Sequence, residues 1–207
     1  MTAAAAAQKG TPGRRGRPGH SLESLLVVAV AVFNERGYEA TSMDELAIRA
    51  GVTKSAIYHH VPSKVELLRL ALDRALDALF AVTEEPGATT GPAIARLEHV
   101  VRGSVRVLTS QLPFVTLLLR VRGNSEVERA ALQRRREFDR IVTDLVRAAE
   151  DEGDVRPDVD PAVTSRLLFG TVNSLTEWYR PGRGLDAAAV ADALVLTTFD
   201  GLRTASR

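Results

Sequence analysis

Cysteine is absent from this chain of 207 residues, and aromatic side chains make up only 5% of it. Without cysteine the protein can form no disulfide, no thiolate nucleophile and no cysteine-ligated zinc or iron–sulfur site. The absence is also typical of proteins in a reducing compartment, so we expect a cytoplasmic protein. The longest unbroken apolar run, residues 25–33, is far shorter than the ~20 residues of a membrane helix. The chain also does not open with a charged segment followed by a hydrophobic one, so we expect no membrane association and no signal peptide.

The short motifs of the common enzyme classes are also missing. The sequence has no His-Glu-x-x-His zinc motif, no Gly-x-Ser-x-Gly nucleophile motif and no glycine-rich phosphate-binding loop. The neighbouring His59 and His60 would point about 100° apart on a helix, which makes them a poor metal-binding pair. We therefore predict that the chain is not an enzyme and uses no cofactor or metal.

The charge is nearly balanced, but it is unevenly distributed. The formal net charge is +1, with 45% hydrophobic residues, which is enough for a packed core. Residues 1–20 contain no acidic residue and are rich in Ala, Gly and Pro, so we expect a disordered basic arm. Within it, the segment 15–18 (Arg-Gly-Arg-Pro) resembles an AT-hook, whose arginines enter the narrow minor groove of A·T-rich DNA. A solvated tail is the alternative. The arm residues that we expect to contact DNA are Arg14, Arg15 and Arg17.

Capping residues and apolar periodicity predict an all-α chain of about nine helices. Ser42 and Ser63 each precede a glutamate by three residues, a pattern typical of a capping box at a helix start. Glycine and proline mark the helix ends. The predicted helices cover about 21–36, 42–50, 53–60, one from 63 to the break at 86–92, one from 92, and then 114–121, 125–152, 161–179 and 186–201.

The first three predicted helices match a helix-turn-helix unit. Gly51 allows the tight chain reversal before the third helix, whose N-terminal turn is expected to enter the major groove. That turn carries the small or polar residues Thr53, Lys54, Ser55 and Ala56. Tyr58, His59 and Lys64 follow this turn and can hydrogen-bond to phosphate oxygens. The free N–H groups of the helix that begins at 63 are expected to point toward the same DNA backbone.

This region resembles the DNA-binding domain of the tetracycline-repressor (TetR) family. The resemblance covers about residues 21–68 and departs from the family at Val61, where an aromatic residue is usual and a smaller one would loosen packing against the third helix. The matching residues are Gly37-Tyr38, Thr41-Ser42-Met43, Ile48, Ala50-Gly51-Val52-Thr53-Lys54, Ile57-Tyr58-His59-His60 and Pro62-Ser63-Lys64.

The resemblance implies an all-α homodimer that binds double-stranded operator DNA and releases it when a small molecule spreads the two reading heads. It implies a basic arm at 1–20, a DNA-binding domain at 21–66 and a larger ligand-binding and dimerisation domain at 67–207. Whether the protein represses or activates transcription depends on the position of the operator. The implied roles are phosphate contact for Thr41 and Ser42, base contact for Lys54, Ser55 and Ala56, and phosphate clamping for Tyr58, His59 and Lys64.

Part of the C-terminal half resembles a TetR subgroup whose effectors are acyl-CoA thioesters. The residues concerned are Leu167-Leu168-Phe169-Gly170, Asn173 and Glu177-Trp178-Tyr179-Arg180-Pro181. The resemblance implies an acyl-CoA or a related apolar acid as the effector. One alternative is an efflux-type regulator that senses a neutral hydrophobic compound, and another is a helical module that binds a protein partner.

Arg134 falls on the apolar face of the helix expected at 125–152, and a buried arginine without a partner is costly. A CoA phosphate or a ligand carboxylate would satisfy it, while an internal acid or extension to the surface is the alternative. Arg120 and Arg122 are similar candidates. The expected pocket also includes Phe80, Phe114, Leu118, Phe138, Phe169, Asn173 and Trp178, although such apolar residues are more often plain core.

The last two predicted helices carry apolar and small side chains that would allow close helix approach. We expect these helices to form half of a four-helix dimer interface. The residues expected there are Leu167, Val172, Leu175, Val190, Leu194 and Thr197.

Overall fold

The computed structural model describes residues 21–202, which form ten α-helices. The all-α prediction is confirmed, and the one unexpected helix is the single turn α5 inside the predicted break. The arm at 1–20, with the minor-groove prediction for its arginines, lies outside the described residues. The helices are α1 Leu22–Arg36, α2 Met43–Ala50, α3 Lys54–Tyr58, α4 Lys64–Glu84, α5 Pro86–Thr89, α6 Ala93–Ser110, α7 Leu112–Arg120, α8 Glu126–Asp151, α9 Pro161–Trp178 and α10 Ala187–Leu202.

The helix starts follow the predicted caps. The hydroxyl of Ser42 accepts a hydrogen bond from the backbone N–H of Glu45, and the hydroxyl of Ser63 accepts one from Glu66, each at 3.2 Å. These bonds satisfy N–H groups that have no partner within the helix. Gly51 ends α2 with a φ of 68°, a left-handed conformation that glycine adopts without steric cost.

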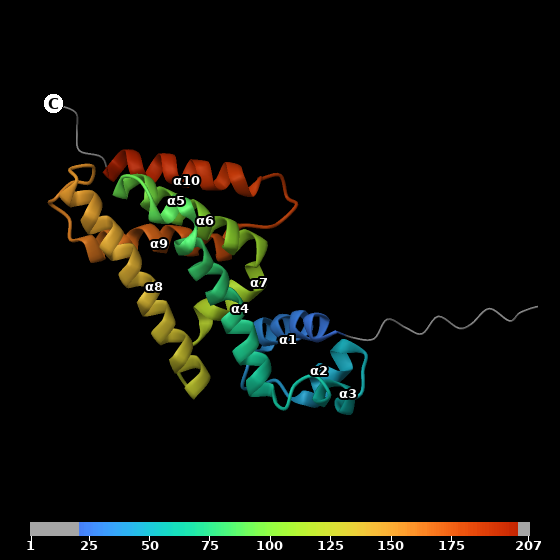
Figure 1. Cartoon of the computed structure of the whole chain (residues 1–207). Helices are drawn as coiled ribbons and strands as arrows, with labels where there is room; N and C mark the ends of the chain where they lie inside the picture. Colours follow the sequence, from blue (N-terminus) through green and yellow to red (C-terminus); the bar gives the residue numbers. More distant parts are fainter. Residues whose placement is uncertain (1–20, 203–207) are drawn as a thin grey trace, which may run out of the picture.

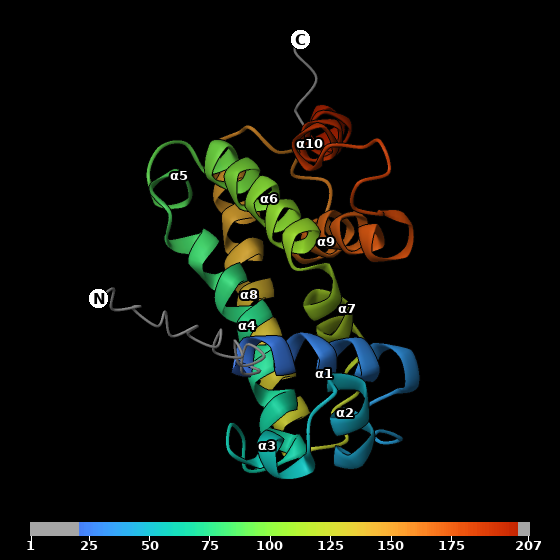
Figure 2. The same cartoon turned by 90° about the vertical axis from the view of Figure 1, so that its right-hand side faces the viewer.

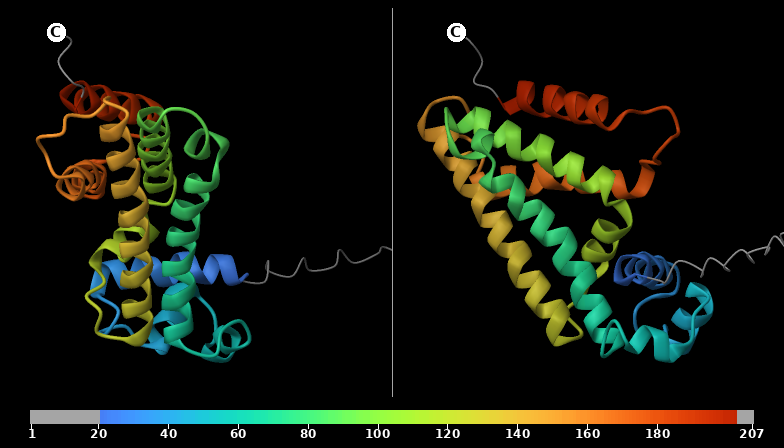
Figure 3. Two further views of the ribbon diagram at one scale, coloured as in Figure 1. Left: turned by 60° about the vertical axis from the view of Figure 1, so that its left-hand side comes forward. Right: turned by 45° about the vertical axis from the view of Figure 1, so that its right-hand side comes forward.

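A small head and a larger helical body make up the molecule (Figure 1). Helices α1 to α3 form the head at one end, and α6, α9 and α10 lie at the other end. The long helices α4 and α8 run side by side between the two ends (Figure 3). Both begin at the head end, so α4 connects the head directly to the body.

The head is attached to the body through α1, which packs against α7 and α4 (Figure 2). Near its C-terminal end, the side-chain amide of Asn34 donates to the carbonyl oxygen of Pro113 at 2.7 Å, and Arg120 donates to the carbonyl oxygen of Asn34 at 2.8 Å. Near its N-terminal end, Glu23 pairs with Arg74 of α4. The apolar core continues from the head into the body without a break.

None of the helices within residues 21–202 is both long and apolar enough to cross a membrane.

Candidate functional site

The face that α3 presents to solvent carries most of the residues expected to read DNA. Ile57 points inward, is 1% exposed and anchors the helix in the core. The residues on the outer side are exposed or half-buried: Thr53, Lys54, Ser55, Ala56, Tyr58 and His59. A short helix anchored on one side and polar on the other has the form required to enter a major groove. The contacts of these outer residues with DNA remain predictions.

Lys54 forms an ion pair with Asp44 of α2, with 2.9 Å between Nζ and Oδ2. Both side chains are largely exposed, and the carboxylate of Asp44 raises the pKa of Lys54 through a hydrogen bond and its charge. If Lys54 contacts a phosphate or a guanine, Asp44 and the DNA compete for its ammonium group.

Thr41 requires a correction of its predicted role. Its side chain is 2% exposed, and its hydroxyl donates to the carbonyl oxygen of Gly37 at 2.8 Å. A buried hydroxyl that is already bonded cannot reach a phosphate, so Thr41 holds the turn before α2 instead. The neighbouring Ser42 is exposed and remains available for the contact that we predicted.

Lys64 also has an internal role that the sequence did not indicate. Its Nζ donates to the carbonyl oxygens of Tyr38 and Thr41, each at 2.8 Å, and of Glu39 at 3.4 Å. The same ammonium lies 4.3 Å from the centre of the Tyr38 ring. An ammonium has three donors, and these three carbonyls occupy them. Lys64 therefore clamps the turn between α1 and α2 to the start of α4.

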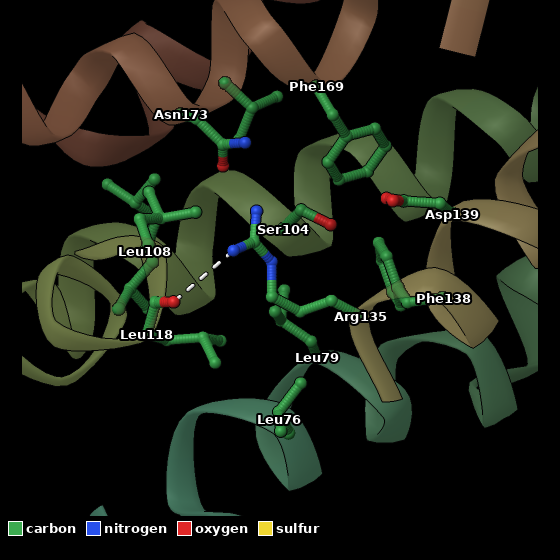
Figure 4. Close-up of a pocket in the computed structure, with 13 residues that line it drawn as sticks. Leu76, Leu79, Ser104, Leu108, Leu118, Arg135, Phe138, Asp139, Phe169 and Asn173 are labelled. Carbon is green, nitrogen blue, oxygen red and sulfur yellow. Dashed lines mark hydrogen bonds between the residues drawn. The ribbon is translucent and has the colours of Figure 1, made fainter. Parts of the chain in front are cut away.

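A cavity of about 50 Å³ lies inside the body, between α4, α6, α7, α8 and α9 (Figure 4). Its walls are mostly leucine, valine and phenylalanine, with four polar side chains among them. The apolar lining residues are Leu76, Leu79, Leu108, Val115, Leu118, Leu119, Phe138, Phe169 and Val172, and the polar ones are Ser104, Arg135, Asp139 and Asn173.

Arg135 brings a positive charge into this cavity. Its guanidinium extends between α6, α7 and α9, and its Nη1 donates to the carbonyl oxygen of Leu118 at 3.4 Å. Burial lowers the pKa of Arg135, and the nearby carboxylate of Asp139 acts in the opposite direction. Burial likewise raises the pKa of Asp139, against the charges of Arg135 and Arg166. The cavity thus combines apolar walls with a poorly compensated cation, a typical arrangement of a small-molecule site.

Two protein-family models match the chain. The model described as bacterial regulatory proteins of the tetR family matches residues 25–71. The model described as the tetracyclin repressor-like C-terminal domain matches residues 90–202, which is more than half of the chain. This protein belongs to the TetR family. It is therefore a DNA-binding transcriptional regulator, as the resemblance implied.

Several TetR-family proteins are similar along nearly their whole length. SCO3833 from Streptomyces coelicolor A3 is 52% identical, with a TM-score of 0.82, over 93% of this chain and 98% of that one. The transcriptional repressor KstR2 from Rhodococcus jostii is 29% identical over 93% of this chain and 94% of its own. AibR, solved in complex with isovaleryl coenzyme A and operator DNA, is 25% identical, with a TM-score of 0.73, over 86% of this chain and 97% of that one.

The cavity brings together four of the residues expected to bind ligand in this TetR-family body: Leu118, Phe138, Phe169 and Asn173. Phe80 lies behind the cavity wall, where its ring meets Phe138 edge to face at 5.9 Å. Phe114 is also outside the cavity, where it packs 4.2 Å beneath the guanidinium of Arg74.

The three arginines that we expected to meet an anionic ligand do not line this cavity. Arg134 pairs with Asp77 at 2.6 Å and Asp73 at 3.2 Å, so the alternative of an internal acid is the one that the structure shows. Arg120 and Arg122 are exposed and border a separate cleft between α1 and α7. The expected charge is supplied by Arg135 instead.

The burial pattern of α8 explains why Arg135, and not Arg134, enters the cavity. The most buried residues of α8 include Ala131, Phe138 and Val142, which are spaced by seven and four residues. Position 135 continues that spacing between 131 and 138, whereas position 134 lies at its edge. This burial pattern is visible only once the helices are packed, whereas the apolar positions of the sequence, such as Val127 and Ile141, are in phase with Arg134. Asp139 and Ser104 had no signal in the sequence either.

An exposed apolar face covers α9 and α10. Trp178, expected in the ligand pocket, lies on this face instead and is 51% exposed. It borders a groove of about 330 Å³ between the two helices, together with Leu185 and Ala189. Of the residues expected to form the dimer interface, Leu167 and Thr197 are exposed, whereas the other four pack inside the chain: Val172, Leu175, Val190 and Leu194.

Proposed function

We propose that this TetR-family regulator is a homodimeric repressor that leaves its operator when the acyl group of an acyl-CoA, or a related apolar acid, enters the body cavity. Two TetR-family relatives support this proposal: KstR2 is a transcriptional repressor, and AibR was solved with isovaleryl coenzyme A and operator DNA. The operator would be roughly palindromic, because two identical heads related by a two-fold axis read two equivalent half-sites.

The observation that carries the proposal is the position of α7 between the cavity and the head. On one side, Val115, Leu118 and Leu119 of α7 line the cavity. On the other side, α7 is bonded to α1 through Asn34, which contacts both Pro113 and Arg120. A ligand that pushes α7 outward therefore also displaces α1 and the reading helix that α1 supports. In a dimer, that displacement changes the distance between the two α3 helices.

The face of α9 and α10 provides the surface for dimerisation. Its exposed apolar residues extend along both helices, and a contiguous apolar patch of this kind marks an interaction surface. They include Val163, Leu167, Trp178, Leu185 and Leu196. Pairing with a second copy of the same face would form a four-helix interface.

The test is to select the operator from random DNA with the full-length protein and then to add ligands to the complex. We expect isovaleryl-CoA or a similar short acyl-CoA to release the operator, and free CoA not to release it. Release by neutral hydrophobic compounds alone would favour the efflux-type alternative. Binding to random DNA as tight as to any selected sequence would favour a protein-interaction module.

A further inference from the structure

The cavity in the body holds a guanidinium that its described neighbours leave largely unpaired. A guanidinium has five N–H donors in a planar fork, and Arg135 donates one long hydrogen bond, to the carbonyl oxygen of Leu118. No carboxylate within residues 21–202 forms an ion pair with Arg135, although the carboxylate of Asp139 lines the same cavity and interacts with its charge, whereas the adjacent Arg134 has two ion-pair partners. Most of the donors of Arg135 are therefore available to an acceptor that enters the cavity.

A second donor points toward the same place. Asn173 extends from α9 toward the Arg135 guanidinium (Figure 4). Its side-chain amide forms no hydrogen bond with the described residues, and a half-turn of that amide exchanges its oxygen and nitrogen. Ser104 donates its proton to the carbonyl oxygen of Val100, so it cannot donate into the cavity. Arg135 and Asn173 are thus the two groups that can donate to the same oxygen atom.

The size and lining of the cavity restrict what such an acceptor can be attached to. One water needs at least about 10–15 Å³ of this kind of volume, so a cavity of about 50 Å³ has room for only a small group. Leu76, Leu79 and Phe138, which also line the cavity, offer only apolar contact. A short hydrocarbon chain that ends in an oxygen acceptor fits this combination.

We propose that Arg135, together with Asn173, binds the acyl oxygen of an effector with a short acyl chain. The oxygen belongs either to the carboxylate of a free acid or to the carbonyl of its CoA thioester. The inference rests on the proposed ligand-responsive function and specifies the chemistry that the cavity recognises. Because the site is mostly apolar, a hydrogen bond from a charged donor there contributes more than it would in water.

The experiment is a calorimetric titration of the full-length protein with isovalerate, isovaleryl-CoA and isoamylamine. The first two carry the same branched chain with an oxygen acceptor, and the third carries it with a cation. We expect isovalerate or isovaleryl-CoA to bind and isoamylamine not to bind. Which of the two binds shows whether the oxygen comes from an acid or from a thioester.

The variant Arg135→Met keeps an unbranched apolar stem but removes the guanidinium with its charge and donors. A hydrogen bond from a charged group contributes ~1.5–3 kcal/mol, so we expect the dissociation constant to rise roughly 10- to 100-fold. The matched control is Arg136→Met, because Arg136 is the next residue on α8 and is exposed. It should bind like the unaltered protein. Arg135→Lys keeps the charge but loses the planar fork of donors, so its dissociation constant should lie between those of Arg135→Met and Arg136→Met.

Four results would overturn the proposal. They are equal binding by Arg135→Met and the unaltered protein, binding of isoamylamine, tighter binding of dodecanoyl-CoA than of isovaleryl-CoA, and no binding of either short acyl ligand. Thermal unfolding and operator affinity without ligand establish that each variant is folded.

The two proposals fail separately. If a short acyl ligand binds through Arg135 but the operator is not released, the proposed function is wrong and this inference stands. If the operator is released by a ligand whose binding is unaffected by Arg135→Met, the inference is wrong and the proposed function stands.

Discussion

Replacing Lys64 with methionine tests whether this residue holds the head together or grips DNA. Methionine keeps the aliphatic stem beside the Tyr38 ring and removes only the ammonium. The loss removes the hydrogen bonds to the carbonyl oxygens of Tyr38 and Thr41 and the weaker contact to Glu39, and the Tyr38 carbonyl keeps only the N–H of Thr41. The turn between α1 and α2 would then be free to move relative to α4.

The size of the effect follows from those contacts. A hydrogen bond to a charged group contributes ~1.5–3 kcal/mol, and the cation–π contact adds about 0.5–1 kcal/mol. Lys64 has two short hydrogen bonds, and its carbonyl partners can partly rehydrate, so we expect a loss of about 2–3 kcal/mol. For a domain of this size that lowers the melting temperature by roughly 5–10 °C.

The assay combines thermal unfolding with operator binding over a range of salt concentrations. The matched control is Lys54→Met, because Lys54 pairs only with the exposed Asp44 in the described structure. An exposed ion pair contributes ~0–1 kcal/mol, so this variant should melt close to the unaltered protein. It should nevertheless lose operator affinity and discriminate less well between operator and random DNA, as expected when a base contact is removed.

The opposite pattern would refute the reasoning. If Lys64→Met melts like the unaltered protein and its salt slope falls by about 1, Lys64 is a phosphate contact and the clamp contributes little to stability. If instead it melts lower and its salt slope is unchanged, the clamp is confirmed and any loss of affinity comes from a poorly ordered head.

Three further predictions concern the head, the junction between head and body, and the dimer. Asp44→Asn should raise operator affinity several-fold at low salt, because it frees Lys54 and removes a charge that repels phosphate; an unchanged affinity across a salt titration would contradict this. Asn34→Leu should change the free energy of unfolding by less than about 1 kcal/mol, because the lost hydrogen bond is offset by removal of Oδ1, which is buried without a partner among the described residues. The variant should still weaken the release of the operator by ligand. Full release would exclude α7 as the transmitting helix. The double variant Leu167→Glu and Leu196→Glu should sediment as a monomer in ultracentrifugation with its helical content retained, and a surviving dimer would place the interface elsewhere.

Much of the head could be predicted from the sequence, because its signals are local. A serine or threonine bonds to an N–H group two or three residues later, and Gly51 adopts its positive φ without a partner from elsewhere in the chain. The caps of α2, α3 and α4 therefore lie where the sequence placed them. The short length of α3 and its outward polar face follow from the same local rules.

The roles of Thr41 and Lys64 could not be predicted in the same way. Thr41 is buried by the packing of α1 and α2, and Lys64 reaches carbonyl groups more than twenty residues earlier in the chain. Family resemblance assigned both residues to DNA, because it compares positions without showing which donors are already bonded. Such contacts between distant segments become visible only when the helices are packed.

The sequence by itself determined the helices, their ends and the reading unit, since hydrogen bonds and side-chain volumes within a few residues decide these features. The tertiary structure decided which charge enters the cavity. Residues 134 and 135 lie about 100° apart on α8, and both border its apolar stripe. The position of α4 places Asp73 and Asp77 beside Arg134, while α7 and α9 leave Arg135 facing the cavity. Helical periodicity alone cannot separate two adjacent residues at the edge of a wide buried face, because the neighbouring helices set where that edge lies.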